Sequence, residues 1–140
     1  MMKKRLLPIS IAFILLILLS ACNGSAPQNN ANDIKVSSSV TNLGEGKTSF
    51  VFTVVDAAGS KTVFNISTNK KMVGEALKEH KLIDGEEGPF GLYVKTVNSI
   101  SYDYDKDGKY WAFYVDDEYA HSGVDKTEIK KGSSYMFKAE

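Results

Sequence analysis

Cysteine and histidine are scarce in this sequence of 140 residues, which holds one cysteine, Cys22, and two histidines, His80 and His121. A single cysteine excludes an internal disulfide, and so few Cys and His residues exclude the usual structural zinc clusters. Basic residues are not in excess either, because 17 Lys and Arg balance 17 Asp and Glu. We therefore expect no nucleic-acid partner.

Catalytic motifs are also missing. The sequence contains no Gly-x-Ser-x-Gly elbow and no phosphate loop ending in Gly-Lys-Ser/Thr. His121 has Ser122 beside it and Asp125 nearby, but neighbours within one loop do not make a catalytic triad. His80 is interpreted as a polar residue near a helix end. We expect a protein that is not an enzyme.

Only one long apolar run is present, Leu6–Leu19, and it follows the basic residues Lys3, Lys4 and Arg5. It is shorter than the roughly 20 residues that a membrane-spanning helix needs. It ends in the small residues of Leu19–Cys22 rather than in a basic stop signal. This order of basic head, apolar run and small residues predicts a secretory signal over residues 1–21.

Leu19–Cys22 (Leu-Ser-Ala-Cys) resembles the lipobox of bacterial lipoproteins, in which the cysteine thiol receives a diacylglyceryl group and begins the mature chain. The alternative is a chance cysteine at the end of an ordinary signal. We expect lipidation of Cys22, and acyl chains that contribute about 0.8 kcal/mol per buried methylene would hold the protein on a bilayer. Residues 22–33 carry no large apolar side chain and are predicted to be a flexible tether. The expected location is the outer face of the cell membrane.

Residues 34–140 are predicted to form one globular domain, which begins with a β-hairpin. Thr48–Asp56 and Lys61–Ser67 are rich in β-branched and aromatic residues, with a turn at residues 57–60 between them. Alternation along the second strand places Phe64 and Ile66 toward the core.

A helix is predicted next, over about residues 72–81, with Thr68 or Asn69 as its cap. Its apolar face follows the i, i+3, i+4, i+7 spacing and consists of Val73, Ala76, Leu77 and His80.

The rest of the domain reads as short strands. We expect a glycine-rich connection at 84–91, a strand at 92–98, a hairpin at 109–120, a polar loop at 124–132 and a last strand at 134–138. The predicted class is α+β, a β-grasp-like mixed sheet of short strands with one helix packed on one face.

The hairpin at 109–120 holds the only tryptophan and concentrates aromatic residues. Trp111, Phe113 and Val115 alternate with Tyr110, Ala112 and Tyr114, and Asp116–Asp117 is a two-residue turn candidate. The first set is predicted to face the core under the helix. Tyr110 and Tyr114 then form the face on which a ligand or partner is to be sought.

Asp103, Asp105, Asp107 and Gly108 match the first half of a calcium-binding loop, where alternating carboxylates supply hard oxygen ligands. The second half does not match, since the twelfth position is Tyr114 instead of an acidic residue. An acidic turn between strands is the preferred interpretation, because Asp and Gly favour turns for backbone reasons. A weak calcium site is the alternative.

From Lys70 onward, the order of several short motifs resembles the bacterial transcobalamin C-terminal-like domain, long catalogued as a domain of unknown function. The motifs are Val73–Leu77, Gly91–Val94, Asn98–Ile100, Asp103–Val115, Glu118–Ala120, Gly123–Asp125 and Ile129–Phe137. This sequence departs from the family at Asp116–Asp117, where Asn-Gly is common, and at His121–Ser122, where Met-Thr is usual. The departures put ligand contacts at those positions in doubt.

The resemblance implies a β-grasp-like fold and a binding role without catalysis. In the animal cobalamin carriers, the related domain closes over a corrinoid together with a larger helical domain, which is not recognised in this sequence. We expect a lipid-anchored exported module that captures a small molecule, with cobalamin as a candidate, or delivers it to a membrane transporter. The candidate contacts are Tyr110, Trp111, Tyr114, Tyr119 and His121. The alternative is an adhesion module that binds an envelope protein and no small molecule.

Overall fold

The computed structural model describes residues 39–140, which belong to the second of two units of the chain, Ile34–Glu140. The predicted signal peptide, the tether and the lipidated Cys22 lie outside the described residues. Within residues 39–140, no helix is long and apolar enough to cross a membrane. The second unit has a core of its own, so we expect it to fold as an isolated domain.

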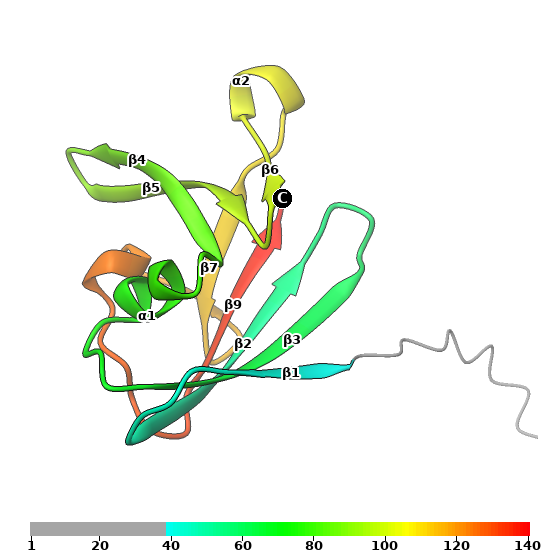
Figure 1. The fold of residues 1–140 in the computed structure, drawn as a ribbon. Helices are drawn as coiled ribbons and strands as arrows, with labels where there is room; N and C mark the ends of the chain where they lie inside the picture. Colours follow the sequence, from blue (N-terminus) through cyan, green and yellow to red (C-terminus); the bar gives the residue numbers. More distant parts are fainter. Residues whose placement is uncertain (1–38) are drawn as a thin grey trace, which may run out of the picture. The chain divides into compact units, whose positions relative to one another are not determined.

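A six-stranded mixed sheet forms the larger part of this unit (Figure 1). Its strands, in spatial order, are β1 (Val40–Leu43), β3 (Lys61–Thr68), β2 (Thr48–Val55), β9 (Ser134–Ala139), β7 (Trp111–Val115) and β8 (Glu118–Tyr119). The pairs β1–β3 and β2–β9 are parallel, and the remaining pairs are antiparallel. The C-terminal strand therefore lies at the centre of the sheet.

A second, antiparallel sheet contains β4 (Ile83–Gly88), β5 (Gly91–Val97) and β6 (Ile100–Ser101). The helices are α1 (Val73–Glu79), the one-turn α2 (Tyr104–Asp107) and the 3₁₀ turn η1 (Val124–Lys126). In Figure 1 the β4–β5 hairpin and α1 lie on the same side of the large sheet. The predicted α+β class is confirmed, although the strands form two sheets instead of the single sheet expected.

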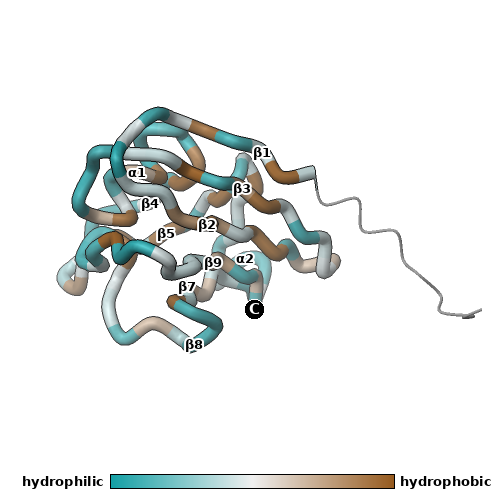
Figure 2. Tube along the Cα trace, turned by 90° about the horizontal axis from the view of Figure 1, so that it is seen from below, coloured by the Kyte–Doolittle hydropathy of each residue, from teal (hydrophilic) through white to brown (hydrophobic). Residues whose placement is uncertain are grey.

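One hydrophobic core joins α1, both sheets and η1. Alternation along the strands supplies it, and Figure 2 shows short apolar segments interrupted by polar ones along the chain. Phe64 and Ile66 point inward, as predicted. Trp111 and Phe113 are buried as well, while Val115 is only partly buried at the core margin. These residues belong to the same cluster as Val73, Ala76 and Leu77 of the helix.

The helix start was predicted incorrectly. Met72 is the N-cap and makes no side-chain capping bond. The Thr68 hydroxyl instead accepts a hydrogen bond from the Lys70 amide (3.0 Å), and the Asn69 side chain accepts one from the Lys47 amide (3.1 Å). Both side chains therefore stabilise the approach to the helix and leave its first turn uncapped.

Three strands, β1, β4 and the two-residue β6, were not predicted. β4 falls in the segment interpreted as a glycine-rich connection, yet it pairs with β5 with a bulge between Asp84 and Gly85. Gly85 is required there, because a Cβ on it would lie 2.0 Å from the Tyr93 carbonyl oxygen. The glycine that suggested a loop allows two strand backbones to approach closely.

Candidate functional site

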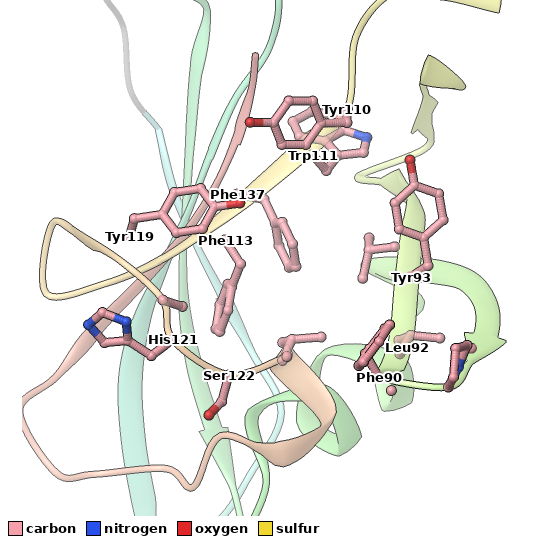
Figure 3. A pocket seen from close by; sticks show the side chains of 17 residues that line it. Phe90, Leu92, Tyr93, Tyr110, Trp111, Phe113, Tyr119, His121, Ser122 and Phe137 are labelled. Atoms are coloured by element: carbon pink, nitrogen blue, oxygen red, sulfur yellow. The ribbon is translucent and has the colours of Figure 1, made fainter. Parts of the chain in front are cut away.

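The main hollow of the described residues is a half-open pocket of about 560 Å³ between two walls (Figure 3). The tip of the β4–β5 hairpin and the first half of β5 form one wall, and the end of β8 with the segment that follows it forms the other. The lining residues are Gly88, Pro89, Phe90, Gly91, Leu92, Tyr93, Val94, Tyr110, Trp111, Phe113, Tyr119, Ala120, His121, Ser122, Gly123, Val124 and Phe137. Seven of the seventeen are aromatic Phe, Tyr or Trp side chains from both walls and the floor.

The floor of the pocket is the outer edge of the core. Trp111, Phe113 and Phe137 are buried there, and the rings of Phe113 and Phe137 lie 5.0 Å apart. The Trp111 indole donates a hydrogen bond to the Ile100 carbonyl (3.2 Å) and packs on Tyr102 at 5.0 Å. The floor is therefore rigid and apolar.

The hairpin wall ends in an unusually exposed aromatic side chain, Phe90, of which 90% is accessible to solvent. Gly88 and Gly91 flank the Pro89–Phe90 tip. The Lys126 ammonium donates a hydrogen bond to the Phe90 carbonyl (3.1 Å) and fastens this tip to the 3₁₀ turn across from it. Figure 3 shows Phe90 and Tyr93 on one side of the pocket, across from Tyr119 and His121.

Beneath the pocket, the Asp125 carboxylate lies against two glycines of opposite walls. A Cβ on Gly91 would lie 2.8 Å from both carboxylate oxygens, and a Cβ on Gly123 would lie 2.7 Å from Oδ1. Oδ1 is buried and has no hydrogen-bond partner among the described residues. The motifs Gly91–Val94 and Gly123–Asp125, distant in sequence, thus meet at one point.

The second wall follows a tight turn. Asp116 and Asp117 have φ values of 51° and 66°, the left-handed geometry of a type I′ hairpin turn. The chain then returns along β8, and the Ala120 amide donates to the Phe113 carbonyl (2.9 Å). This pairing brings Tyr119 and His121 to the pocket rim, where both are exposed.

Four of the five predicted contacts, Tyr110, Trp111, Tyr119 and His121, line the pocket. Partial burial raises the pKa of Tyr110, and nearby Tyr119 and Glu140 add to the effect. Tyr110 directly precedes β7, Trp111 begins β7, Tyr119 ends β8, and His121 follows Ala120.

Tyr114, the fifth predicted contact, does not line the pocket. Its hydroxyl donates a 2.5 Å hydrogen bond to Glu140, which raises the pKa of Tyr114 to about 12 and lowers the pKa of Glu140. Its ring packs edge-on against Tyr119 at 5.5 Å. Tyr114 therefore supports the rim through its cross-strand partner Tyr119.

The acidic segment at Asp103–Asp107 forms a helical turn instead of a plain connecting turn. The Asp103 carboxylate caps α2 by accepting from the Asp105 amide (3.1 Å), and the Asp107 carboxylate accepts from the Asp103 amide (2.7 Å). Among residues 39–140, no three His, Cys, Asp or Glu side chains come together in a way that could hold a metal ion.

The sequence analysis did not predict the pocket wall that the β4–β5 hairpin forms. Phe90, Leu92 and Tyr93 line the pocket but were assigned to a connection and a plain strand. The available signal was an aromatic residue between two glycines, Gly88 and Gly91, because such a tip can expose a ring without strain.

Solved structures share this fold. A candidate metal-binding protein from Ruminococcus gnavus ATCC 29149 is similar with a TM-score of 0.64 and 26% identity, over 67% of this chain and 97% of that one. Haptocorrin in complex with Cbi is similar with a TM-score of 0.50 and 16% identity, over 71% of this chain and 26% of that one. The likeness to haptocorrin confirms the expected transcobalamin-like fold, while this chain spans about a quarter of that protein.

No curated protein matches the sequence. A family model described as a domain of unknown function, DUF4430, matches residues 70–140. These residues include α1, the β4–β5 hairpin, the β7–β8 hairpin and every residue that lines the pocket. The chain therefore belongs to the DUF4430 family.

Proposed function

We propose that this protein is a binding module that captures an amphipathic small molecule in the aromatic pocket, with a corrinoid as the leading candidate, and carries out no catalysis. The pocket carries this proposal. Its volume of about 560 Å³ suits a small-molecule site, which typically measures roughly 300–1,000 Å³ and combines apolar walls with few polar groups.

The chemistry of the lining fits a ligand with a flat apolar face and a polar edge. Phe90, Tyr93 and Tyr119 offer rings on two sides, and large ligands bury such rings favourably. His121 and Ser122 add polar groups at the rim, and imidazole is also a common metal ligand.

A corrinoid would also bring its own metal ion, held by the macrocycle. Such a ligand requires no cluster of three protein side chains, and none is found among the described residues. The fold shared with haptocorrin, crystallised with Cbi, supports the corrinoid as the first ligand to test.

Trp111, the only tryptophan, lies in the pocket and serves as an internal probe. Cobinamide and cobalamin are titrated into the Ile34–Glu140 unit and followed by fluorescence and calorimetry. We expect quenching and heat, and Tyr119→Ala should weaken binding about five- to tenfold through the lost ring contact.

Val40→Ala is the control, since Val40 is 56% exposed against 55% for Tyr119, does not line the pocket and lies in the edge strand β1. Binding should persist in this variant. No heat and no quenching with either ligand at high micromolar concentration would remove the corrinoid proposal.

We also propose that lipidation of Cys22 anchors this module to the outer face of the cell membrane, where it passes its ligand to a membrane transporter. The sequence Leu19–Cys22 supports the anchor. The test is metabolic labelling with palmitate and cell fractionation. Label should be lost in Cys22→Ser, and a Cys22→Ser protein that remains labelled would exclude the anchor.

An adhesion module is the second candidate, because one row of side chains across the large sheet holds two tyrosines, a methionine and two valines. Strand register aligns Tyr119, Tyr114, Met136, Thr53, Val63 and Val40 across all six strands. A pull-down from membranes that recovers an envelope protein, and loses it with Tyr114→Ala, would favour this function. Corrinoid binding that is weakened by Tyr93→Ala, at a residue that lines the pocket and is not part of this row, would favour the pocket.

A further inference from the structure

A second, smaller hollow of about 380 Å³ lies between three segments that are distant in sequence. We call it the basic hollow, and its lining residues are Lys47, Thr48, Asn69, Lys70, Lys71, Glu128 and Ile129. It shares no residue with the aromatic pocket.

Hydrogen bonds hold these three segments in place. The Lys47 amide donates to the Asn69 side chain (3.1 Å), which joins the loop before β2 to the segment before α1. The Ile129 amide donates to the Lys71 carbonyl (2.8 Å), and Met72 forms an isolated β-bridge with Glu128. The backbone around the hollow is therefore fixed before any ligand arrives.

The charge of the hollow is unbalanced. Three lysines face one glutamate, although the whole sequence has equal numbers of basic and acidic residues. Within residues 39–140, the ion pairs with Asp or Glu use Lys78, Lys95, Lys106 and Lys138, and none of the three lysines of the hollow. Their positive charges are therefore not neutralised by an ion pair and can attract an anion.

The remaining polar groups also suit an anion. The Thr48 hydroxyl and the Asn69 amide group can both donate hydrogen bonds, so donors outnumber acceptors around the hollow. Lysine ammonium groups bind phosphate as point charges without the fixed fork geometry of arginine. We propose that the basic hollow binds a phosphate group, which either a soluble phosphate compound or the headgroup of an anionic phospholipid can supply.

The test uses the Ile34–Glu140 unit and two probes. Inorganic pyrophosphate is titrated by calorimetry at about 20 mM ionic strength, where screening is weak. Vesicles of phosphatidylglycerol with phosphatidylcholine are compared with pure phosphatidylcholine vesicles by co-sedimentation. We expect binding to at least one phosphate source, with each of Lys47→Gln, Lys70→Gln and Lys71→Gln weakening it about fivefold.

Two variants control for net charge. The triple variant of Lys61, Lys81 and Lys109 to Gln removes as much charge as the triple variant of Lys47, Lys70 and Lys71 to Gln. Its three substitutions are at exposed sites that do not line the hollow, so it should bind as the unmodified protein does. Glu128→Gln should strengthen binding about threefold, since it removes the only carboxylate of the hollow.

Binding of pyrophosphate identifies the soluble source, and lysine-dependent binding to phosphatidylglycerol vesicles alone identifies the headgroup. The proposal is overturned if neither probe binds. It is also overturned if the control triple variant loses as much affinity as the three lysine variants of the hollow, or if Glu128→Gln weakens binding.

Discussion

The β2–β3 and β4–β5 hairpins differ in the regularity of their pairing and in the burial of their side chains. β2 and β3 pair in unbroken register from Thr48↔Thr68 to Val55↔Lys61, and their inward side chains are almost all buried. β4 and β5 pair across a bulge, and beyond Ile83 the side chains of β4 are mostly exposed. The first hairpin ends in a polar turn, the second in the exposed Phe90.

This difference separates stability from ligand access. The β2–β3 hairpin contributes aromatic rings to the core, whereas the tip of β4–β5 contributes its ring to the wall of the pocket. Elements that bury little apolar surface open at low free energy, and ligand-binding segments are commonly of this kind. The substitutions below test whether the two roles are separate.

The largest expected effect comes from Phe52→Ala compared with Phe90→Ala. Phe52 is fully buried and packs against Phe64 and Phe137, so its removal should cost about 3–5 kcal/mol of unfolding free energy. Phe90→Ala should change stability by no more than about 0.5 kcal/mol, because the ring is exposed. Urea unfolding followed by Trp111 fluorescence measures both.

Corrinoid affinity should show the opposite order. Phe90→Ala should weaken binding about five- to tenfold through loss of a ring contact. If Phe90→Ala destabilises the protein as much as Phe52→Ala does, the tip is part of the core and the comparison fails.

The sequence allowed prediction of one hairpin and not of the other for physical reasons. β2–β3 alternates apolar and polar residues because one face is buried, and this period is readable from a single chain. β4 carries Gly85, Glu86 and Glu87, whose composition is typical of a connection. Its strand character comes from pairing with β5 at a glycine contact, which is a tertiary effect that local composition does not encode.

Glycine substitution gives the next largest effect. Gly91 has φ of 112°, and a Cβ there would meet the Asp125 carboxylate at 2.8 Å, so Gly91→Ala should cost about 2–3 kcal/mol. Gly59, in the β2–β3 turn, has φ of 81° with nothing within 4 Å, so Gly59→Ala should cost about 1 kcal/mol from backbone strain alone.

Thermal unfolding of both glycine variants tests this ranking. Gly91→Ala should also alter Trp111 fluorescence, because the tip moves relative to the pocket floor, while Gly59→Ala should leave the spectrum unchanged. Equal costs at the two positions would show that Asp125 does not fix the hairpin tip.

The pocket residues that could be predicted from the sequence are those in or next to the β7–β8 hairpin. Trp111 was found from the period of its strand, and Tyr110, Tyr119 and His121 from their closeness to it in the same hairpin. Tyr114 does not line the pocket, and its hydrogen bond to Glu140, 26 positions away, could not be read from local sequence. Phe90 was missed because the opposite wall is built from a separate sheet.

Acid and alkali should act on different parts of the structure. The Tyr114 hydrogen bond lowers the pKa of Glu140 from its usual 4.5, so the stability it contributes to the large sheet is present above that value. This stability is lost as the pH falls through the lower pKa of the folded state. The Glu86 hydrogen bond raises the pKa of Lys95 above 10.5, so its contribution to β4–β5 is present below that value and lost as the pH rises through the higher folded pKa.

Urea midpoints measured across pH assign the two effects. Glu140→Gln should flatten the decline on the acid side, and it should also change the alkaline side because Glu140 raises the pKa of Tyr114. Lys95→Met should flatten the decline on the alkaline side and leave the acid side unchanged. Exposure of both groups to solvent keeps each effect small. A Glu140→Gln variant with an unchanged acid profile would show that the Tyr114 bond contributes no stability to the large sheet.

The smallest expected effect is a gain in stability in the wall opposite the β4–β5 tip. Asp117 adopts φ of 66° at the second position of the type I′ turn, where glycine carries no steric penalty, so Asp117→Gly should stabilise the protein by about 0.5–1 kcal/mol. Asp116 is the control, since its carboxylate accepts a hydrogen bond from the Ser134 amide (2.8 Å) and Asp116→Gly should lose this bond. Thermal unfolding of both variants measures the difference. If Asp117→Gly instead destabilises the protein, the Asp117 side chain contributes more to this turn than the relief of backbone strain does.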